Sequence, residues 1–223
     1  MQYGEPFYQQ VLPGIGITNV LSASEIDKVV DHGYGACLNA SEFDFEADTT
    51  NRVAYRWTPL VDGTGNDIQD FIRAVETLHE FRSKGLVTLV NCYAGVSRSA
   101  SIVATYMVKY EQENLKLLAQ ERLVEPPPLQ FRALHGHLND KALQGKHPHA
   151  DDPLFDLLWK AFQCIAHVRP VVYMRPSMWE ELFPQLRPYL LENRGIEGGG
   201  APPAGDGHNE TLARNGPQGV DEG

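Results

Sequence analysis

Cys92 and Arg98 are the two residues whose types and spacing indicate chemistry most strongly. Five residues separate them, and they lie between two apolar stretches, Leu86–Val90 and Ser99–Tyr110. The first stretch is typical of a strand buried on both faces, and the second of a buried helix. A strand, a short loop and a helix in this order bring backbone N–H groups and the positive end of a helix dipole to one place. The pattern therefore predicts a concave anion site.

The side chains of this loop suit a tetrahedral oxyanion. Arg98 can bind two oxygens through parallel hydrogen bonds, and Gly95 allows a tight backbone turn. Cys92 would lie at the floor of the site, where the same positive field favours a thiolate nucleophile. A lone Cys after a strand is more often a small core residue, but the buried strand, the central Gly, the Ser beside Arg98 and the following helix together favour the nucleophile. The predicted phosphate-binding loop comprises Cys92, Tyr93, Ala94, Gly95, Val96, Ser97 and Arg98.

A thiolate that attacks a phosphate ester needs a proton donor for the leaving oxygen, and that donor should lie on another loop. Asp62 is our candidate, because it follows a predicted strand in a Gly-rich segment. Asp-Gly is also a common turn pair, so Asp62 could be an ordinary turn residue. Asp67 is the competitor, but its position in the first turn of a predicted helix already explains it structurally.

Strand-like and helix-like segments alternate through the first 145 residues. This order predicts an α/β fold with a central, mostly parallel sheet flanked by helices. We expect Ser24 and Asn66 to cap the helices that follow them. Besides the two stretches that flank the loop, the expected strands are Ile17–Leu21, Ala36–Leu38 and Val53–Leu60, and the expected helices are Glu25–His32, Asn66–Ser83, Leu115–Leu123 and Leu129–Leu143.

The rest of the chain divides into two parts by composition. Residues 146–194 form a mainly helical C-terminal extension or small subdomain, with helical patterns at Leu154–Ala166 and Met178–Leu191 around a β-like Val171–Met174. Residues 195–223 are rich in Gly and Pro and poor in large aliphatic residues, so we expect a disordered tail. The predicted site-bearing domain is therefore 1–145.

Charge and composition exclude several function classes. The chain of 223 residues has 19 basic and 29 acidic residues, a net charge of −10, and no Lys/Arg cluster. A generic nucleic-acid binder or a partner of anionic membranes needs such a cluster, so neither partner is expected. No apolar run approaches the roughly 20 residues that cross a bilayer, and no signal peptide is visible. Three scattered cysteines do not make a disulfide framework, and we expect a cytoplasmic protein.

Histidine pairs raise the question of a metal site. His135 and His137 form one pair, and His147 and His149 form another. No Cys or carboxylate partner stands at a fixed spacing from either pair, so we interpret these residues as solvated histidines of a helix and a loop. No metal and no other cofactor is expected, because a thiolate, Arg98 and the backbone can do the chemistry alone.

The segment from Ile17 to Leu143 resembles the cysteine-based protein tyrosine phosphatases, in particular the compact dual-specificity phosphatases. The most specific element of this resemblance is the family's CxxGxSRS signature, which is intact from Cys92 to Ser99. The resemblance implies the phosphatase-type fold. It also implies that Cys92 is the nucleophile, Arg98 the phosphate clamp, Asp62 the general acid and Ser97 the hydroxyl that helps the thiolate leave.

One residue departs from the family pattern. The family usually has His before the nucleophile, where this chain has Asn91. An Asn can donate a hydrogen bond to loop carbonyls but carries no positive charge, so we expect a less acidic thiol. A phosphate-binding pseudophosphatase is therefore one alternative function.

The loop has no Lys and the chain is acidic, which favours phosphoproteins over lipid phosphates or RNA 5′ ends. The expected substrate carries phosphotyrosine, with phosphoserine and phosphothreonine as open alternatives. Neither the physiological substrate nor the oligomeric state follows from the sequence.

Overall fold

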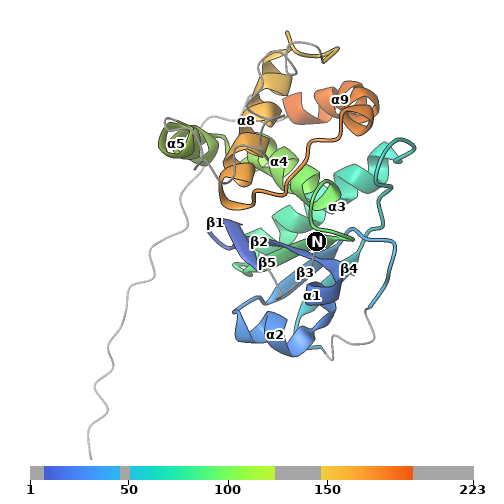
Figure 1. The fold of residues 1–223 in the computed structure, drawn as a ribbon, viewed down its shortest axis with the longest axis vertical. Coiled ribbons are helices and arrows are strands. Elements are labelled where there is room, and N and C mark those ends of the chain that lie inside the picture. Colours follow the sequence, from blue (N-terminus) through green and yellow to red (C-terminus); the bar gives the residue numbers. More distant parts are fainter. Residues whose placement is uncertain (1–7, 46–50, 124–146, 193–223) are drawn as a thin grey trace, which may run out of the picture. The chain divides into compact units, whose positions relative to one another are not determined.

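The computed structural model describes residues 8–45, 51–123 and 147–192 (Figure 1). The described part forms one compact unit. The predicted helix Leu129–Leu143, the first histidine pair and the predicted tail at 195–223 lie outside the described residues.

A five-stranded sheet in the order β1-β2-β5-β3-β4 forms the centre of the fold. Its β1–β2 pair is antiparallel, and the other three pairs are parallel. This arrangement confirms the predicted α/β fold with a mostly parallel sheet. The strand that leads to the predicted loop, β5, lies between β2 and β3, so the loop leaves the carboxyl end of the central strand, where open α/β sheets bind ligands. The strands are β1 (Gln9–Leu12), β2 (Ile15–Asn19), β3 (Ala36–Asn39), β4 (Ala54–Trp57) and β5 (Thr88–Cys92).

Helices cover both faces of the sheet (Figure 1). The short helices α1 (Val20–Ser24) and α2 (Ile26–Asp31) lie on one face, and α3 (Ile68–Ser83) and α4 (Arg98–Tyr110) lie on the other. Helices α5 (Gln112–Arg122), α8 (Pro153–Val168) and α9 (Pro176–Leu191) form a further layer, with α5 and α8 packed on α4 and α9 on α3.

Two predicted helix caps are wrong. Ser24 is the last residue of α1, which is capped by Asn19, and α2 begins at Ile26 without a side-chain cap. The cap of α3 is Asp67, whose carboxylate accepts a hydrogen bond from the N–H of Gln69.

Asn66 instead braces the loop before α3. Its amide oxygen accepts from the N–H of Val61 at 2.8 Å, and its NH₂ group donates to the carbonyls of Val61 and Gly63. A residue with both a donor and an acceptor can close a loop on itself, which is a role that spacing alone does not distinguish from capping.

Residues 171–174 do not form the predicted strand. They run as an irregular segment between α8 and α9. Val172 and Met174 are buried whereas Val171 and Tyr173 are exposed, so the alternation that resembles a strand is real. Among the described residues, no strand pairs with this segment. The backbone N–H of Tyr173 instead donates to the carbonyl of Val96 at 3.1 Å.

The helices of the C-terminal extension belong to the main hydrophobic core. Trp179 in α9 is fully buried, and its ring packs edge-on against Phe162 in α8 and Phe71 in α3, with centroids 5.7 and 6.2 Å apart. Removing the extension would therefore expose a large apolar face of α3 and α4.

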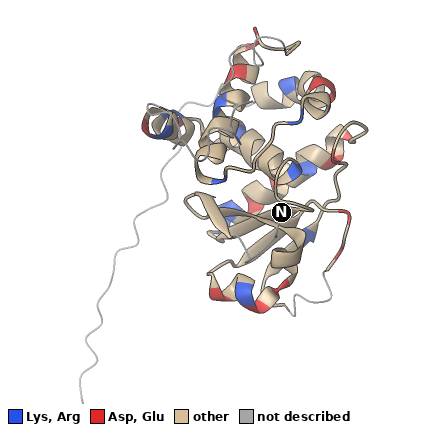
Figure 2. Ribbon diagram, in the orientation of Figure 1, with Lys and Arg blue, Asp and Glu red and all other residues tan. Residues whose placement is uncertain are grey.

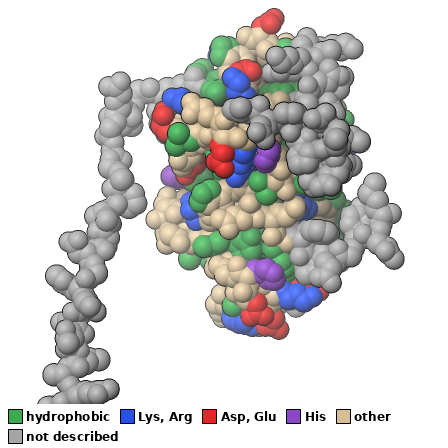
Figure 3. All heavy atoms as spheres, turned by 60° about the vertical axis from the view of Figure 1, so that its left-hand side comes forward, with side chains coloured by type: hydrophobic (Ala, Val, Ile, Leu, Met, Phe, Trp, Pro, Cys, Tyr) green, Lys and Arg blue, Asp and Glu red, His purple; other side chains and the backbone are tan. Residues whose placement is uncertain are grey.

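Charges of both signs are interspersed over the helices (Figure 2), and the described residues visible in Figure 3 likewise include basic and acidic side chains. Among the described helices, none has the length and apolar character to span a membrane.

We expect Trp179→Ala to destabilise the protein by about 3–5 kcal/mol, because it leaves a cavity between three helices. Chemical denaturation followed by circular dichroism measures this loss. Leu117→Ala on α5 is the matched control, since that side chain is 63% exposed and should change stability by less than about 0.5 kcal/mol. Equal effects of the two substitutions would show that α9 is not part of the core.

Candidate active site

Cys92 is the last residue of β5, and its side chain is only 2% exposed. Its Sγ lies 3.4 Å from Oγ of Ser99 in the first turn of α4. A hydroxyl at this distance can donate a hydrogen bond to a thiolate and stabilise it. The Oγ of Ser97, which we predicted for this role, is buried and has no hydrogen-bond partner among the described residues. The structure therefore places Ser99, and not Ser97, beside the sulfur, because a helical Cα–Cβ bond tilts toward the helix N-terminus.

Three carbonyl groups of the 92–98 loop are held by donors from distant segments. The carbonyl of Tyr93 accepts from the N–H of Val20 at 3.1 Å, that of Gly95 from Nε of Arg169 at 2.7 Å, and that of Val96 from the N–H of Tyr173 at 3.1 Å. A trans peptide unit is planar, with its C=O and N–H pointing in opposite directions. These contacts therefore turn the N–H groups of residues 94, 96 and 97 to the opposite side, where they can converge on an anion.

Gly95 is required where the loop passes closest to β2. Its φ is +66°, in the left-handed region, and a Cβ at this position would lie 2.4 Å from the carbonyl oxygen of Thr18. Only Gly fits both the backbone conformation and the space.

Arg98 is the first residue of α4 and is 4% exposed. Its Nη1 donates to the carbonyl of Leu60 and to Oε2 of Glu42, both at 2.9 Å, and more weakly to the carbonyl of Ala40 at 3.4 Å. Its Nε is buried and has no partner within the described chain. One corner of the guanidinium is thus fixed while its Nε remains available for an oxyanion.

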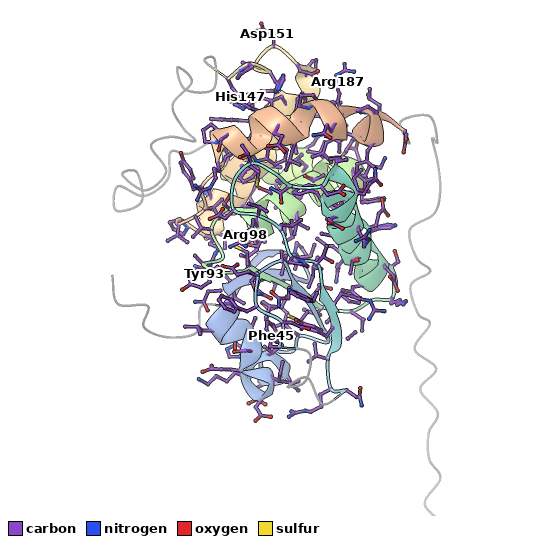
Figure 4. The ribbon with its side chains drawn as sticks, turned by 90° about the vertical axis from the view of Figure 1, so that its right-hand side faces the viewer. Phe45, Tyr93, Arg98, His147, Asp151 and Arg187 are labelled. Carbon is purple, nitrogen blue, oxygen red and sulfur yellow. The ribbon has the colours of Figure 1, made fainter. Side chains whose placement is uncertain are left out.

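Glu42 is the counter-ion of Arg98. The hydrogen bond from Arg98 is the main reason that the pKa of the Glu42 carboxyl lies below its ordinary value. Figure 4 shows Arg98 and Tyr93 at the middle height of the molecule, between the helical layer that carries Arg187 and the part of the sheet near Phe45.

A family model described as "Dual specificity phosphatase, catalytic domain" matches residues 16–120 of the chain, which include this loop and its strand and helix. Residues 16–120 belong to the dual-specificity phosphatase family. The resemblance drawn from the sequence is thereby confirmed.

Curated relatives agree with this assignment of the phosphatase domain. Dual specificity protein phosphatase 5 of the rat is 33% identical over 127 residues, which cover 55% of this chain and 33% of the relative. Human dual specificity protein phosphatase 12 is 28% identical over 123 residues, which cover 50% of this chain and 36% of the relative. The chain thus spans about a third of the length of these relatives.

Solved structures agree on the fold. Human DUSP28 superposes with a TM-score of 0.56 and 18% identity, covering 83% of this chain and 96% of that one. The human tyrosine phosphatase-like serine/threonine/tyrosine-interacting protein superposes with a TM-score of 0.53 and 18% identity, covering 82% and 97%.

Asp62 lies in the 61–66 loop of the phosphatase domain, and its carboxylate is bound by Arg175. The Nε and Nη2 atoms of Arg175 donate to the two Asp62 oxygens at 3.2 and 2.9 Å. Glu181 of α9 accepts from the N–H of Gly65 in the same loop. The residues just before and within α9 therefore hold this loop at two places. Asp67, the other candidate for the general acid, caps α3, which is the structural role that its position in the sequence indicates.

From the sequence, Asn91 could donate a hydrogen bond to the loop carbonyls, but the structure shows another partner. Its amide nitrogen donates to Oδ1 of Asn39 at 2.8 Å, and its oxygen lies 3.5 Å from Sγ of Cys37. The side chain of Asn91 is therefore directed toward β3, into a buried polar cluster. Burial raises the pKa of the Cys37 thiol to about 12, so Cys37 is an unreactive core residue.

Two aromatic side chains stand beside the site. Tyr93 is 55% exposed, Phe43 is 53% exposed, and their ring centroids are 6.0 Å apart. Both are adjacent to site residues, since Tyr93 follows Cys92 and Phe43 follows Glu42.

Sequence reasoning missed Glu42, Arg169, Tyr173 and Arg175. The last three contribute their contacts from a segment more than 70 residues beyond the loop. The available signal was Arg169 itself, an Arg between Val168 and the apolar stretch Val171–Met174.

We expected the second histidine pair to be solvated, but both residues are half-buried and their rings pack against aromatic side chains. The ring of His147 stacks on Phe155 at 4.2 Å, and that of His149 lies 5.0 Å from Phe183. In the described ranges, no group of three or more His, Cys, Asp or Glu residues is placed to hold a metal ion.

We expect Arg98→Lys to weaken the binding of inorganic phosphate nearly as much as Arg98→Ala, by roughly 10- to 100-fold, because an ammonium ion cannot replace two directed hydrogen bonds to a charged ligand. Isothermal titration calorimetry measures this loss. Arg82→Lys, which alters a guanidinium that binds backbone carbonyls at the other end of β5, is the control and should bind phosphate normally. Near-normal binding by Arg98→Lys would contradict the proposed clamp.

Proposed function

We propose that this protein hydrolyses phosphate monoesters of phosphoproteins through a cysteinyl-phosphate intermediate. The observation that carries the proposal is the buried Cys92 sulfur at the end of β5, in a loop whose carbonyl groups are held from outside. The Nε of Arg98 beside it has no partner among the described residues. Such a site can bind the phosphoryl group and hold it against the nucleophile.

In the first step, the Cys92 thiolate attacks phosphorus, the bond to the leaving oxygen breaks, and that oxygen takes a proton from Asp62. The loop N–H groups and Arg98 stabilise the charge on the equatorial oxygens. In the second step, water attacks the phosphocysteine, Asp62 takes a proton from this water, and the S–P bond breaks. The Ser99 hydroxyl, 3.4 Å from the sulfur, stabilises the departing thiolate.

Asp62 must leave Arg175 before it can act in this cycle. Both of its oxygens accept hydrogen bonds from the guanidinium, and a carboxyl group donates its proton through one of the same oxygens. The ion pair is about 40% exposed at both side chains, so its net strength is at most about 1 kcal/mol and does not prevent this rearrangement.

Phosphotyrosine is the substrate group that this site fits best. Tyr93 and Phe43 offer two exposed rings beside the site, and aromatic side chains pack well against the ring of a phenyl phosphate. A thiolate nucleophile has to stay reduced, so a cytoplasmic location is part of this proposal.

A binding-only pseudophosphatase remains the second candidate, because Asn91 is neutral and Asp62 is paired with Arg175. The first experiment is therefore turnover of a phosphotyrosine peptide by the full chain.

We expect Cys92→Ser to abolish turnover and to retain phosphate binding. An alcohol is a far weaker nucleophile at neutral pH, whereas the backbone and Arg98 that hold the anion are unchanged. Phosphate release and calorimetric phosphate binding, measured on the same preparation, check both parts. Substantial residual turnover would contradict the role of Cys92, and no turnover by the wild-type chain would favour the pseudophosphatase.

We expect Asp62→Asn to reduce turnover about 10²–10⁴-fold on phosphopeptides and much less on an activated aryl phosphate, because a general acid matters most for a basic leaving group. The basic limb of the pH–rate profile should also flatten. Asp67→Asn is the matched control and should change little, since Asn caps helices about as well as Asp. If Asp67→Asn alone shows the dependence on the leaving group, Asp62 is the wrong acid.

A further inference from the structure

Arg169 is a buried cation that contacts the 92–98 loop from outside. Its side chain is 3% exposed and follows α8 directly. Its Nε donates to the carbonyl of Gly95 at 2.7 Å, and its Nη1 donates to Oε1 of Gln9 at 2.7 Å and to the carbonyl of Ile17 at 3.4 Å. All three acceptors are neutral. Among the described residues, no carboxylate forms an ion pair with Arg169.

A buried charge of this kind is unfavourable unless an anion compensates it. Burial lowers the pKa of Arg169 to about 10. Arg169 therefore keeps its proton at neutral pH and brings a positive charge to the loop that begins at Cys92.

The other charges near the site do not replace this positive charge. The charge of Arg98 is offset by Glu42 at 2.9 Å, and Asn91 next to the nucleophile is neutral. Arg169 thus differs from Arg98. Among the described residues, no carboxylate offsets the charge of Arg169 beside the loop. Other charged or titratable groups on the loop and on the segments bonded to it include Tyr93, Tyr173, Cys37, His167 in the last turn of α8, and the pair Asp62–Arg175.

The geometry also ties Arg169 to the shape of the loop. A Cβ added to Gly95 would lie only 2.6 Å from Nη2 of Arg169. The guanidinium therefore packs directly against this glycine. By holding the Gly95 carbonyl, Arg169 directs the N–H of Val96 away from itself and toward the opposite side of the loop.

We propose that Arg169 is a positioning residue that orients the 92–98 loop and whose positive charge keeps Cys92 in its thiolate form. This inference rests on the proposed function, because the first chemical step of that function needs a thiolate at Cys92. With this role for Arg169, the C-terminal extension contributes a residue to the candidate active site.

The test is the rate of alkylation of Cys92 by iodoacetamide as a function of pH, followed by mass spectrometry of the Cys92 peptide in the full-length chain. Only the thiolate reacts, so the midpoint of the curve reports thiolate formation and requires no turnover. We expect Arg169→Gln to raise this midpoint by about one pH unit or more, which is a tenfold loss of thiolate at a pH below both midpoints.

Three further variants keep the test decisive if Arg169→Gln does not fold. Gln9→Glu places a carboxylate on Nη1 of Arg169 while retaining an acceptor there, and it should raise the midpoint as well. Gln10→Glu is the matched control, because it adds the same charge on the exposed neighbour in β1 and should leave the midpoint unchanged. Arg169→Lys keeps the charge and should stay closer to the wild type than Arg169→Gln.

Unchanged midpoints in Gln9→Glu and in a folded Arg169→Gln would overturn the proposal, even if the melting temperature fell. An upward shift of equal size in Gln10→Glu would overturn it too, because the effect would then be one of general charge. A chain with these shifts but without phosphatase turnover would contradict the proposed function and leave the role of Arg169 standing.

Discussion

A loop that binds an anion through its backbone must have its carbonyl groups held on the outer side. Each peptide unit that turns its N–H inward turns its C=O outward, and a buried carbonyl needs a donor. Three donors meet this need here, from Val20 at the start of α1, from Arg169 after α8 and from Tyr173 before α9. The shape of the candidate site therefore depends on segments far from the loop in the sequence.

The C-terminal extension is for this reason more than a packing element. Its helices share the core with α3 and α4, which fixes the connecting segment 169–175 beside the loop. From that segment and from α9, Arg175 and Glu181 also hold the loop that carries Asp62. The loop that begins at the candidate nucleophile and the candidate acid are thus both hydrogen-bonded to residues that the family model, which ends at 120, does not include.

Sequence patterns predicted the parts of the site that are formed by one contiguous segment of the chain. The apolar run before Cys92, the central Gly95 and the helix after Arg98 are contiguous, and together they predict the strand, loop and helix that the structure contains. The parallel sheet was predictable for a similar reason, because alternating strands and helices leave few other arrangements.

Contacts between distant segments were not predictable in this way. Which hydroxyl approaches Cys92 depends on the first turn of α4, and Ser97 and Ser99 differ little in sequence context. Asn66 could brace a loop as readily as cap a helix, and the alternation in residues 171–174 arises from packing without a partner strand. Arg169 looks like any interhelical Arg until the fold places it against Gly95. The domain boundaries at 145 and 194 stay predictions.

The most direct measurement of the central claim is to trap the covalent intermediate. A phosphotyrosine substrate is mixed with the full-length protein, the reaction is quenched in acid within milliseconds, and the digested peptides are analysed by mass spectrometry. The account predicts that the peptide containing Cys92 gains the mass of one phosphoryl group, and that this species disappears as turnover is completed. Substrate turnover with no phosphorylated Cys92 peptide, or with the phosphoryl group on another residue, would contradict it.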